Sequence, residues 1–494
     1  MAFGIFNKDK EEDLVTMVKD IVEPEAIPNA NQLSEKYYYR YRENHGVNLG
    51  SCFVLEPWIF DNLFDKGGSC EFDAITNLSR AIGVEATAQR LNQHYSDYIN
   101  KIDWIFLKNV ANITALRVPI GYWHVNNGSF LGGLPFQPLQ SVYSKAKPWD
   151  QLRNLISIAS KYRIGILIDI HGLPGGANTD FHSGFNNPSP SFFSNGNYVN
   201  AMTEKILPFI VQNICSPNNN VIGLQIVNES VFDNNANGQK FYYAKAAVAI
   251  RKVDSFLPVI ISDGWWPGQW GDWLQLTKLY NTVVVDTHVY RCYSDSDKSK
   301  NAGQIINDLA GSVNLPNDRG DFVVGEFSCV LDQSTWNKTQ GSRSDWVRKY
   351  GNAQVSIFRK EASWGSFFWT LKFRWGDGGE WGFIPMTNQG CVPKRSTQGV
   401  NIDDNKVNQI IQQHISYWKD KGGEKMEHWR FQDAIRAAVN DIRAFSSFDN
   451  SRIGRWYSWK AQRRQAYIQS KGDSEYMWEW DQGYQQGLDN FNRF

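Results

Sequence analysis

The sequence predicts an α/β protein in which eight parallel strands close into a (β/α)8 barrel of the TIM type, followed by a helical C-terminal appendage. Short apolar runs rich in β-branched residues recur eight times, and runs such as IGILIDI and VIGLQIV suit strands buried on both faces. Segments of helical length lie between the runs. Polar residues also concentrate where the strands end, as they do at the active-site face of a barrel enzyme.

The predicted strands follow one another in chain order. They cover residues 45–53, 113–120, 164–171, 221–228, 258–262, 282–289, 321–327 and 366–372. The clearest helical segments between them are residues 149–161, 200–215, 238–254 and 346–361. An open doubly wound sheet is the structural rival. No GxGxxG motif follows the first strand, which weakens the dinucleotide-binding form of that rival.

We divide the chain into an N-terminal helix and lead-in (1–36), the barrel (37–399) and a helical, aromatic-rich C-terminal extension (400–494). The extension holds no strand-like run, and its apolar residues between 434 and 445 recur at helical spacing, which predicts one apolar helix face. Two interpretations stay open: an appendage packed on the barrel, or a docking surface for a protein partner. The docking surface would use Trp456, Trp459, Trp478 and Trp480.

The composition argues against several kinds of partner. The 51 basic and 51 acidic residues give zero formal charge, so we expect neither nucleic acid nor an anionic membrane as the main partner. No apolar run is long enough to span a bilayer. Six scattered cysteines without a CxxC pair predict free thiols, and the first residues lack an apolar stretch of secretory length. We therefore predict an intracellular, cytoplasmic protein.

Two glutamates stand at the carboxyl ends of predicted strands four and seven. Glu229 ends VIGLQIVNE, and Glu326 lies in FVVGEFS. In an eight-stranded ring these two ends face one another across the mouth. Cleavage of a glycosidic bond needs two carboxyl groups on opposite sides of the anomeric carbon, so the pattern predicts a glycosidase. We predict Glu229 as general acid/base and Glu326 as nucleophile; carboxyl groups about 5–5.5 Å apart would favour the retaining route.

Other polar residues at the strand ends are expected to support this pair. Arg117, His288 and Tyr290 are candidates to stabilise the charge of Glu326 through hydrogen bonds. We expect burial and the charge of Glu326 to raise the pKa of Glu229, so that Glu229 holds its proton near neutral pH.

The remaining polar residues suggest no metal chemistry. His124 and His182 are interpreted as loop or rim residues. The sequence shows no His/Asp/Glu cluster with ligand spacing outside the carboxylate site, so we predict no catalytic metal.

Seven motifs occur in order between about residues 37 and 395: GVNLGSCFVLEPWI, LRVPIGYW, DIHGLPGGANTDFHSG, IVNES, DTHVYRCYS, VGEFS and FFWTLKF. Together they resemble glycoside hydrolase family 5, and within it the fungal exo-1,3-β-glucanase branch. With its C-terminal extension, the chain is similar to an intracellular fungal subgroup. The resemblance implies a TIM barrel, retention of configuration, a β-glucoside substrate and no cofactor. Besides the two catalytic glutamates, it implies substrate contacts by Glu56, Arg117, His171, Asn228, His288, Tyr290 and Trp369.

The chain departs from this family pattern at three places. It has NES where members usually have NEP, and loss of the proline predicts a looser loop around Glu229. Phe327 and Leu371 stand where the glucanases have tryptophan, which predicts altered contacts to the part of the substrate beyond the reacting glucose.

Three functions stay open. The first is an exo-type β-glucosidase that hydrolyses an oligosaccharide or a glucosylated lipid. The second is a carbohydrate-binding protein that has lost turnover, and the third is a transglycosylase. Four tryptophans after the fifth predicted strand are either loop core or an apolar aglycone site: Trp265, Trp266, Trp270 and Trp273.

Overall fold

The computed structural model describes residues 14–19, 21, 23–24 and 26–492, and its centre is a closed barrel of eight parallel strands in chain order. Strand β1 pairs with both β2 and β8, which closes the ring. The strands are β1 (Asn44–Asn48), β2 (Ala115–Gly121), β3 (Gly165–Gly172), β4 (Val221–Gln225), β5 (Val259–Ser262), β6 (Val283–Arg291), β7 (Asp321–Leu331) and β8 (Gly365–Phe368). The predicted (β/α)8 barrel is therefore confirmed, and each predicted strand overlaps an observed one.

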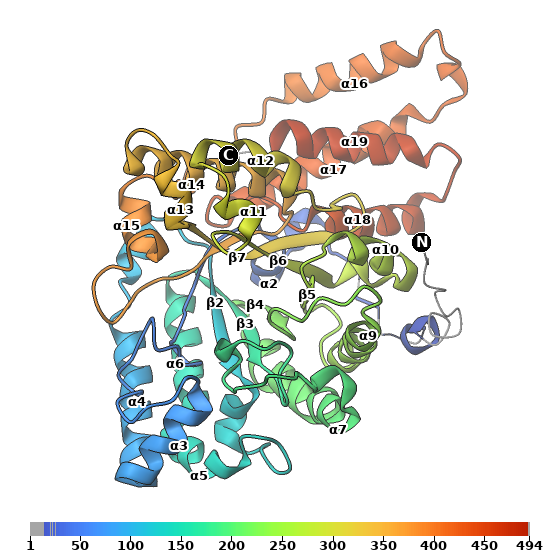
Figure 1. Cartoon of the computed structure of the whole chain (residues 1–494). Helices are drawn as coiled ribbons and strands as arrows, with labels where there is room; N and C mark the ends of the chain where they lie inside the picture. The colour runs from blue at the N-terminus through green and yellow to red at the C-terminus, as the bar shows by residue number, and fades with distance from the viewer. Residues whose placement is uncertain (1–13, 20, 22, 25, 493–494) are drawn as a thin grey trace, which may run out of the picture.

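Helices surround the barrel in the order that the strand connections require (Figure 1). The α- and π-helices of this part are α2 (Glu35–Tyr41), α3 (Glu71–Ile82), α4 (Val84–Asn100), η2 (Phe106–Val110), α5 (Gln140–Ala146), α6 (Pro148–Lys161), α7 (Gly196–Asn200), η7 (Ala201–Ile206), α8 (Leu207–Ile210), η8 (Val211–Cys215), α9 (Asn237–Arg251), α10 (Gly268–Thr277), α11 (Asp295–Lys298), α12 (Ala302–Ser312), α13 (Gln333–Asn337), α14 (Arg343–Glu361) and α15 (Phe383–Asn388). Short 3-10 turns are η1 (Ala30–Gln32), η3 (Tyr122–Gly128), η4 (Gln137–Leu139), η5 (Phe181–Ser183), η6 (Phe192–Ser194), η9 (Leu279–Asn281), η10 (Gly379–Trp381) and η11 (Gly423–Lys425).

The predicted helix at 200–215 is helical throughout but not uniform, since α7, η7, α8 and η8 follow one another without a break. Pro208 lies in its middle. Proline has no N–H to donate and its ring collides with the preceding turn, so a regular α-helix cannot continue through it. The wider π turns on both sides of α8 accommodate this defect.

The amino-terminal end of the barrel interior is plugged by aromatic side chains. Tyr39 from α2 and Phe448 from the C-terminal extension pack against the inward-facing residues at the starts of the strands. Burying a side chain of the size of phenylalanine contributes about 1.5–3 kcal/mol. The cavity lies at the opposite end of the barrel, where the carboxyl ends of the strands meet.

Helix α2 crosses the predicted boundary between residues 36 and 37, because its residues serve both neighbours. Tyr37, Tyr38 and Tyr41 contact the core of the extension, whereas Tyr39 contacts the barrel core. Of the N-terminal helix expected within 1–36, residues 14–18 are helical, and residues 1–13 lie outside the described part.

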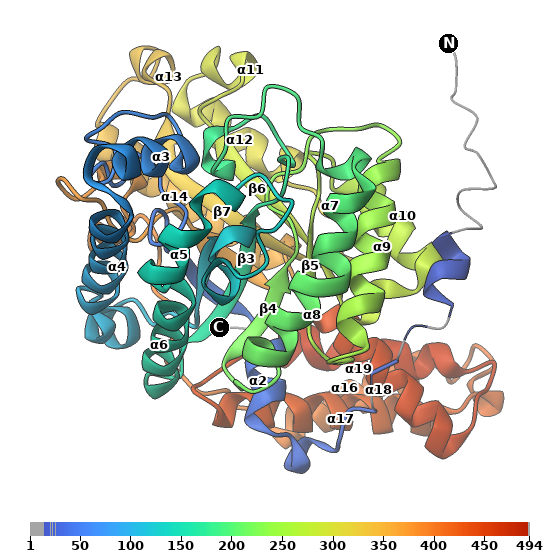
Figure 2. The same ribbon diagram turned by 90° about the horizontal axis from the view of Figure 1, so that it is seen from below.

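The C-terminal extension is a bundle of four helices: α16 (Asp404–Trp418), α17 (His428–Ser447), α18 (Trp456–Lys471) and α19 (Met477–Phe491). The apolar face predicted between residues 434 and 445 is buried in its core. Glycines let α17 and α19 approach closely, since a Cβ at Gly483 would lie 2.4 Å from the carbonyl oxygen of Phe431. Figure 2 shows these helices along one end of the barrel.

The extension docks on the amino-terminal end of the barrel through polar contacts as well as Phe448. Asp321, the first residue of β7, accepts hydrogen bonds from the backbone N–H groups of Tyr457 and Ser458 (3.1 and 3.2 Å) at the start of α18. The guanidinium of Arg455 lies 4.4 Å from the ring centre of Tyr41 in α2. The extension is thus an appendage packed on the barrel, at the end opposite the strand termini.

The predicted docking surface of four tryptophans does not form. Trp459 and Trp480 are core residues of the extension, with at most 1% of each side chain exposed. Trp456 packs against the same core, and only Trp478 is exposed. Within the described part of the chain, no helix combines the length and the apolar character needed to cross a membrane. All six cysteines are free and buried.

Candidate active site

The carboxyl ends of the strands surround a cavity of about 690 Å³. Seven of the nine predicted site residues line it: Glu56, His171, Glu229, His288, Tyr290, Glu326 and Trp369. The other two, Arg117 and Asn228, are fully buried directly beneath these residues and contact them there. The structure therefore brings all nine predicted site residues together at one end of the barrel.

Glu326 projects from β7 and is held by three neighbours on two other strands, β2 and β6. Arg117 of β2 donates to its Oε1 atom over 2.8 Å, and the Tyr290 hydroxyl of β6 donates to Oε2 over 2.8 Å. His288 Nδ1 lies 3.5 Å from Oε2. Burial and the charge of Glu326 raise the pKa of Tyr290, so its hydroxyl keeps its proton and can only donate to the carboxylate. These contacts fix the position of the carboxylate and stabilise its negative charge, as the sequence predicted.

Arg117 acts as a buried positioning residue. Besides Glu326, it donates to Asn48 Oδ1 (2.9 Å), Gln225 Oε1 (2.9 Å) and Asn228 Oδ1 (2.7 Å). Burial acts to lower the pKa of Arg117, but the carboxylates of Asp169, Glu326 and Asp286 outweigh it and raise that pKa, so the guanidinium stays charged. The family resemblance implied that Arg117 contacts the substrate. In the structure Arg117 lies below the cavity, and each nitrogen of its guanidinium already donates to a protein oxygen.

Glu229 follows β4 and has a strained backbone, with a φ of 40°. Non-glycine residues adopt this region rarely, and such strain persists only where surrounding contacts enforce it. Two contacts do so here: Asn178 donates to the Glu229 carbonyl oxygen (2.9 Å), and the Ser230 backbone N–H donates to Ser262 Oγ (3.0 Å). A proline at position 230 could not make the second bond. A hydrogen bond thus restrains buried Ser230 where family members have the proline ring, and the looser loop stays a prediction.

The carboxyl group of Glu229 contacts two histidines. Its Oε1 lies 2.6 Å from His288 Nδ1, and its Oε2 lies 3.1 Å from His182 Nε2. Burial acts to raise the pKa of Glu229, but the hydrogen bonds from His182 and His288 outweigh burial and hold this pKa well below its usual range. The expectation of a raised pKa for Glu229 is thus wrong for the free enzyme, because sequence reasoning placed neither histidine against it.

His288 carries the proton that Glu229 lacks. Both of its ring nitrogens face carboxylates, since Nε2 lies 3.0 Å from Asp286 Oδ2 while Nδ1 faces Glu229. Burial acts to lower the pKa of His288, but Glu326 and Asp286 outweigh burial and raise it well above the usual value. His288 Nδ1 lies only 2.6 Å from Glu229 Oε1, so a proton on Nδ1 can pass directly to the carboxylate. The pair can therefore deliver a proton to the cavity.

The two glutamates approach one another closely. One oxygen of Glu229 and one of Glu326 lie, together with a nitrogen of His288, within 4.8 Å of each other. Inverting glycosidases keep their carboxyl groups about 6.5–9.5 Å apart to admit a water molecule, whereas retaining enzymes hold them at about 5–5.5 Å. An approach of the nearest oxygens to within 4.8 Å is compatible with the shorter separation.

The rest of the cavity wall is suited to a sugar. Trp369 lies almost parallel to the ring of His171, at 13° and 5.9 Å between ring centres. Asp169 fixes the orientation of His171 through a 2.7 Å contact with Nδ1. Asn228 donates toward His171 Nε2 over 3.4 Å. Burial raises the pKa of Glu56, whose Oε2 accepts from the Trp58 indole N–H (2.9 Å).

An aromatic rim surrounds the mouth, formed by Trp58, Trp265, Tyr293 and Trp381. Trp58, Trp265 and Tyr293 expose 49%, 51% and 64% of their surface. The predicted tryptophan group after the fifth strand therefore divides. Trp265 belongs to the rim and Trp266 is exposed, whereas Trp270 and Trp273 are buried core, as the loop-core interpretation required.

Phe327 and Leu371 do not line the cavity. Phe327 alternates with Glu326 along β7, so its ring points outward and packs edge-on against Phe358 of α14 and Phe368 of β8. Leu371 is buried, and its N–H donates to the Asn48 carbonyl oxygen (3.0 Å). These two departures from the family pattern lie in the core, so the predicted altered contacts to the substrate do not come from these side chains.

Sequence reasoning missed His182, which it assigned to a loop, and the rim residues Trp58 and Trp381. His182 lies on η5, and Asp180 helps to raise its pKa together with Glu229, although burial opposes them. The signal for Trp58 was its place two residues after Glu56 in LEPW. His124, in contrast, is buried against Glu71, away from the cavity.

Two sets of cavity residues have the spacing of metal ligands: Asp180, His182 and Glu229, and Glu229, His288 and Glu326. In the second set both oxygens of Glu326 already accept hydrogen bonds, and His288 is saturated by carboxylates on both nitrogens. Hydrogen bonding thus accounts for this group without an ion.

Comparison with known proteins identifies the class of enzyme. A family model of the glucan 1,3-beta-glucosidase 3 C-terminal domain matches residues 401–494. An uncharacterized glycosyl hydrolase of Saccharomyces cerevisiae is 52% identical over 474 residues, covering 95% of this chain and 94% of the relative. Glucan 1,3-beta-glucosidase 3 of Schizosaccharomyces pombe is 30% identical over 460 residues, covering 90% of this chain and 95% of the relative.

Among solved structures, the rutinosidase from Aspergillus niger shares the fold, with a TM-score of 0.53 and 22% identity over 72% of this chain and 98% of that chain. Barrel, paired glutamates and relatives together define a glycoside hydrolase that acts on β-glycosides. The chain belongs to the fungal glucan 1,3-β-glucosidase-like glycoside hydrolases.

Proposed function

We propose that the protein is a retaining, exo-type β-glucosidase that removes a terminal glucose through a covalent glycosyl-enzyme intermediate. The observation that carries this proposal is the approach of Glu229 and Glu326 oxygens to within 4.8 Å of each other. At this separation one carboxylate reaches the anomeric carbon directly while the other reaches the glycosidic oxygen, so Glu326 itself takes the place that a nucleophilic water has in an inverting enzyme.

In the first step a Glu326 oxygen attacks the anomeric carbon and the glycosidic C–O bond breaks. The departing oxygen takes a proton from Glu229, which receives it from His288 across the 2.6 Å contact. Arg117 and Tyr290 hold Glu326 in line for the attack. Forming the ester neutralises Glu326.

In the second step water attacks the same carbon from the side of Glu229. Glu229 is ionised, accepts the proton of this water and returns it to His288 Nδ1, so the protein regains its starting protonation state. The bond to Glu326 breaks and glucose leaves with its original configuration. An acceptor sugar in place of water would make the same enzyme a transglycosylase, and product analysis at high substrate concentration separates these outcomes.

The substrate is proposed to be a β-glucoside whose aglycone rests on the aromatic rim. Relatives named as glucan 1,3-beta-glucosidases suggest an oligosaccharide. Exposed Trp58 and Trp265 favour an apolar aglycone, such as that of a glucosylated lipid, because their faces are hydrophobic and half of their surface meets solvent. We also propose that the protein works inside the cell, since six free buried thiols suit a reducing compartment.

The covalent step is tested with a fluorinated β-glucoside that traps the intermediate. Mass analysis of peptides from the inactivated protein should place the label on Glu326. The Glu326→Gln protein should bind glucoside but acquire no label. A label on another residue, or hydrolysis with inverted configuration measured by NMR, contradicts the retaining assignment. Wild-type protein that binds sugars and hydrolyses no β-glucoside supports the non-catalytic alternative.

A further inference from the structure

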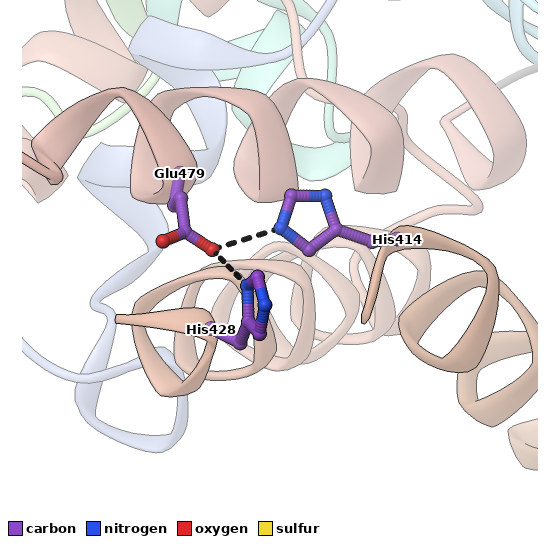
Figure 3. A group of neighbouring side chains, drawn as sticks. All are labelled: His414, His428 and Glu479. Carbon is purple, nitrogen blue, oxygen red and sulfur yellow. Dashed lines mark hydrogen bonds and ion pairs between the residues drawn. The ribbon is translucent and has the colours of Figure 1, made fainter. Parts of the chain in front are cut away.

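A cluster of two histidines and one glutamate lies in the C-terminal extension, at the opposite end of the molecule from the cavity. His414 is near the end of α16, His428 is the first residue of α17, and Glu479 lies in the first turn of α19. Figure 3 shows the two imidazole rings directed at one carboxylate. The three side chains therefore join three helices at a single point.

The geometry of this histidine–glutamate cluster is compact. His414 Nε2 and His428 Nδ1 lie 2.8 and 2.7 Å from the same Oε2 atom of Glu479. One ligand atom from each residue fits within 4.8 Å of the others. Stacking on Phe431 at 3.9 Å and 10° holds the His414 ring, and the two imidazoles stand at 88° to each other. Two nitrogens and one carboxylate thus converge from different directions.

The charge of Glu479 has no cationic side chain beside it. Its side chain is fully buried, and its Oε1 atom has no hydrogen-bond partner within the described part of the chain. Among the residues described, the ion-pair partners of Glu479 are the two histidines alone, with neither lysine nor arginine within reach. Arg430 on α17 binds Glu427 and the Gly472 carbonyl oxygen instead. A buried carboxylate without a counter-charge is costly, so the site favours a cation.

We propose that His414, His428 and Glu479 form a binding site for one divalent transition metal, with Zn²⁺ as the preferred ion. Imidazole nitrogen together with carboxylate oxygen is a donor set that zinc accepts, and water would complete a tetrahedron. Bonds of about 2.0–2.1 Å place tetrahedral ligands about 3.3 Å apart. The two nitrogens would therefore withdraw from Oε2 by about half an ångström, which is small against the freedom of side-chain torsions.

The site would act structurally, by fastening α16 to the rest of the extension. Figure 1 shows α16 at the outer edge of the extension, and Ile410 and Ile415 pack against the core while only partly buried. The side chains that α16 buries are Val407, Ile411 and His414. His414 is the last of these, and a bond from it to the metal would fix the end of α16 just before the exposed linker at 419–422. The cation would also neutralise Glu479.

Metal binding is tested on the untagged full-length protein, stripped with EDTA and titrated with Zn²⁺ or Co²⁺. We expect one ion per chain and, for Co²⁺, visible absorption bands of a nitrogen- and oxygen-ligated ion. Glu479→Gln and His428→Gln should each weaken binding at least tenfold, as loss of a ligand does. Glu475→Gln is the matched control, because it removes an exposed carboxylate four residues away and should bind as wild type does.

A second measurement needs no variant. Lys419, Lys421 and Lys425 follow α16 and are exposed to trypsin. Zinc should slow cleavage after these residues in the wild type, and EDTA should restore it. Wild-type protein that takes up no zinc at micromolar free metal overturns the proposal, as does binding that survives Glu479→Gln and disappears in Glu229→Gln. In either case the histidines serve only as hydrogen-bond donors to Glu479.

Discussion

The two ends of the barrel carry the same chemical group in different settings. At the carboxyl end Glu229 contacts His182 and His288, and in the extension at the amino-terminal end Glu479 contacts His414 and His428. Around Glu229 the histidines meet further carboxylates, Asp180 and Asp286. Around Glu479 they meet none within ion-pair distance, as far as the described residues go.

This difference decides what each group can do. Extra carboxylates raise the pKa of His182 and His288 against the opposing effect of burial, so these histidines become cations and the proton moves along the contact with Glu229. The group also opens on a cavity of about 690 Å³, where the proton can be used. The closed cluster around Glu479 offers lone pairs and a negative charge to an external cation. Identical residue types thus serve proton transfer at one end and ion binding at the other.

The largest effects are expected when the two catalytic glutamates are replaced one at a time. Glu326→Gln should lower kcat/KM on every β-glucoside by a factor on the order of 10⁴ or more, because the nucleophile is lost. Glu229→Gln should cost about 10²–10⁴-fold on alkyl glucosides, which need a protonated leaving oxygen. It should cost much less on nitrophenyl glucosides, whose leaving group departs unprotonated. Steady-state kinetics on matched alkyl and nitrophenyl substrates measure this difference.

Glu479→Gln is the control for both variants, since it lies at the other end of the barrel. Its kcat/KM should equal that of the wild type. Equal losses for Glu229→Gln on both substrate types would remove Glu229 from the acid role, and a large loss for Glu479→Gln would show that the two ends are coupled.

Much of the barrel end could be predicted from the sequence, because its signals are local. Buried parallel strands read as continuous apolar runs, and a glutamate directly after such a run marks the open end of a barrel. Glu229 and Glu326 both carry this signal. The protonation of Glu229 could not be predicted, because it depends on His182, which reaches the carboxylate from a loop after β3. No spacing in the sequence encodes that approach.

The extension shows the opposite case. Its apolar helix face was readable from residues 434–445, but the cluster around Glu479 was not, because the sequence shows no ligand spacing there. His414, His428 and Glu479 are far apart in the chain and come from three helices. Ligand motifs are recognised by short spacing on one element, so this set becomes visible only after the bundle has formed.

The effect of zinc on thermal stability should show which end of the barrel binds the ion. A ligand that binds only the folded state at about 100 times its Kd stabilises that state by about 2.7 kcal/mol. We expect a corresponding rise in the thermal unfolding midpoint of the wild type, measured by calorimetry with and without zinc. The Glu229→Gln protein should show the same rise, and Glu479→Gln should show none. A rise that follows Glu229 instead would place the ion in the cavity.

His288 and His428 provide a matched pair for the pH dependence of catalysis. The catalytic proton rests on the His288–Glu229 pair, and the carboxylates around His288 raise its pKa above 6.5 although burial opposes them. The pair therefore stays protonated above pH 6.5, and kcat/KM should fall only as the pH rises through this raised pKa.

In His288→Gln the proton must rest on Glu229 alone. We expect the basic limb of the kcat/KM profile to move to lower pH by about one unit, with about a tenfold loss near neutral pH. His428→Gln removes the equivalent contact from Glu479 and should leave the limb in place. An unshifted limb in His288→Gln would show that Glu229 holds its proton without help from this histidine.

The smallest expected effect concerns the aromatic residues exposed at each end. Trp265 lies at the mouth of the cavity and exposes 51% of its surface, whereas Trp429 exposes 40% on the extension. If the aglycone rests on the rim, Trp265→Ala should raise KM about fivefold for glucosides with a large apolar aglycone, in keeping with about 1 kcal/mol for one aromatic contact. Methyl β-glucoside has no large aglycone to place on the rim, so its KM should be unaffected.

Trp429→Ala is the control and should change the KM of neither substrate, since its indole lies on the extension, away from the cavity. Equal effects of Trp265→Ala on both substrates would mean that this indole supports the loop around the cavity, and the preference for an apolar aglycone would then have to come from Trp58 or Tyr293.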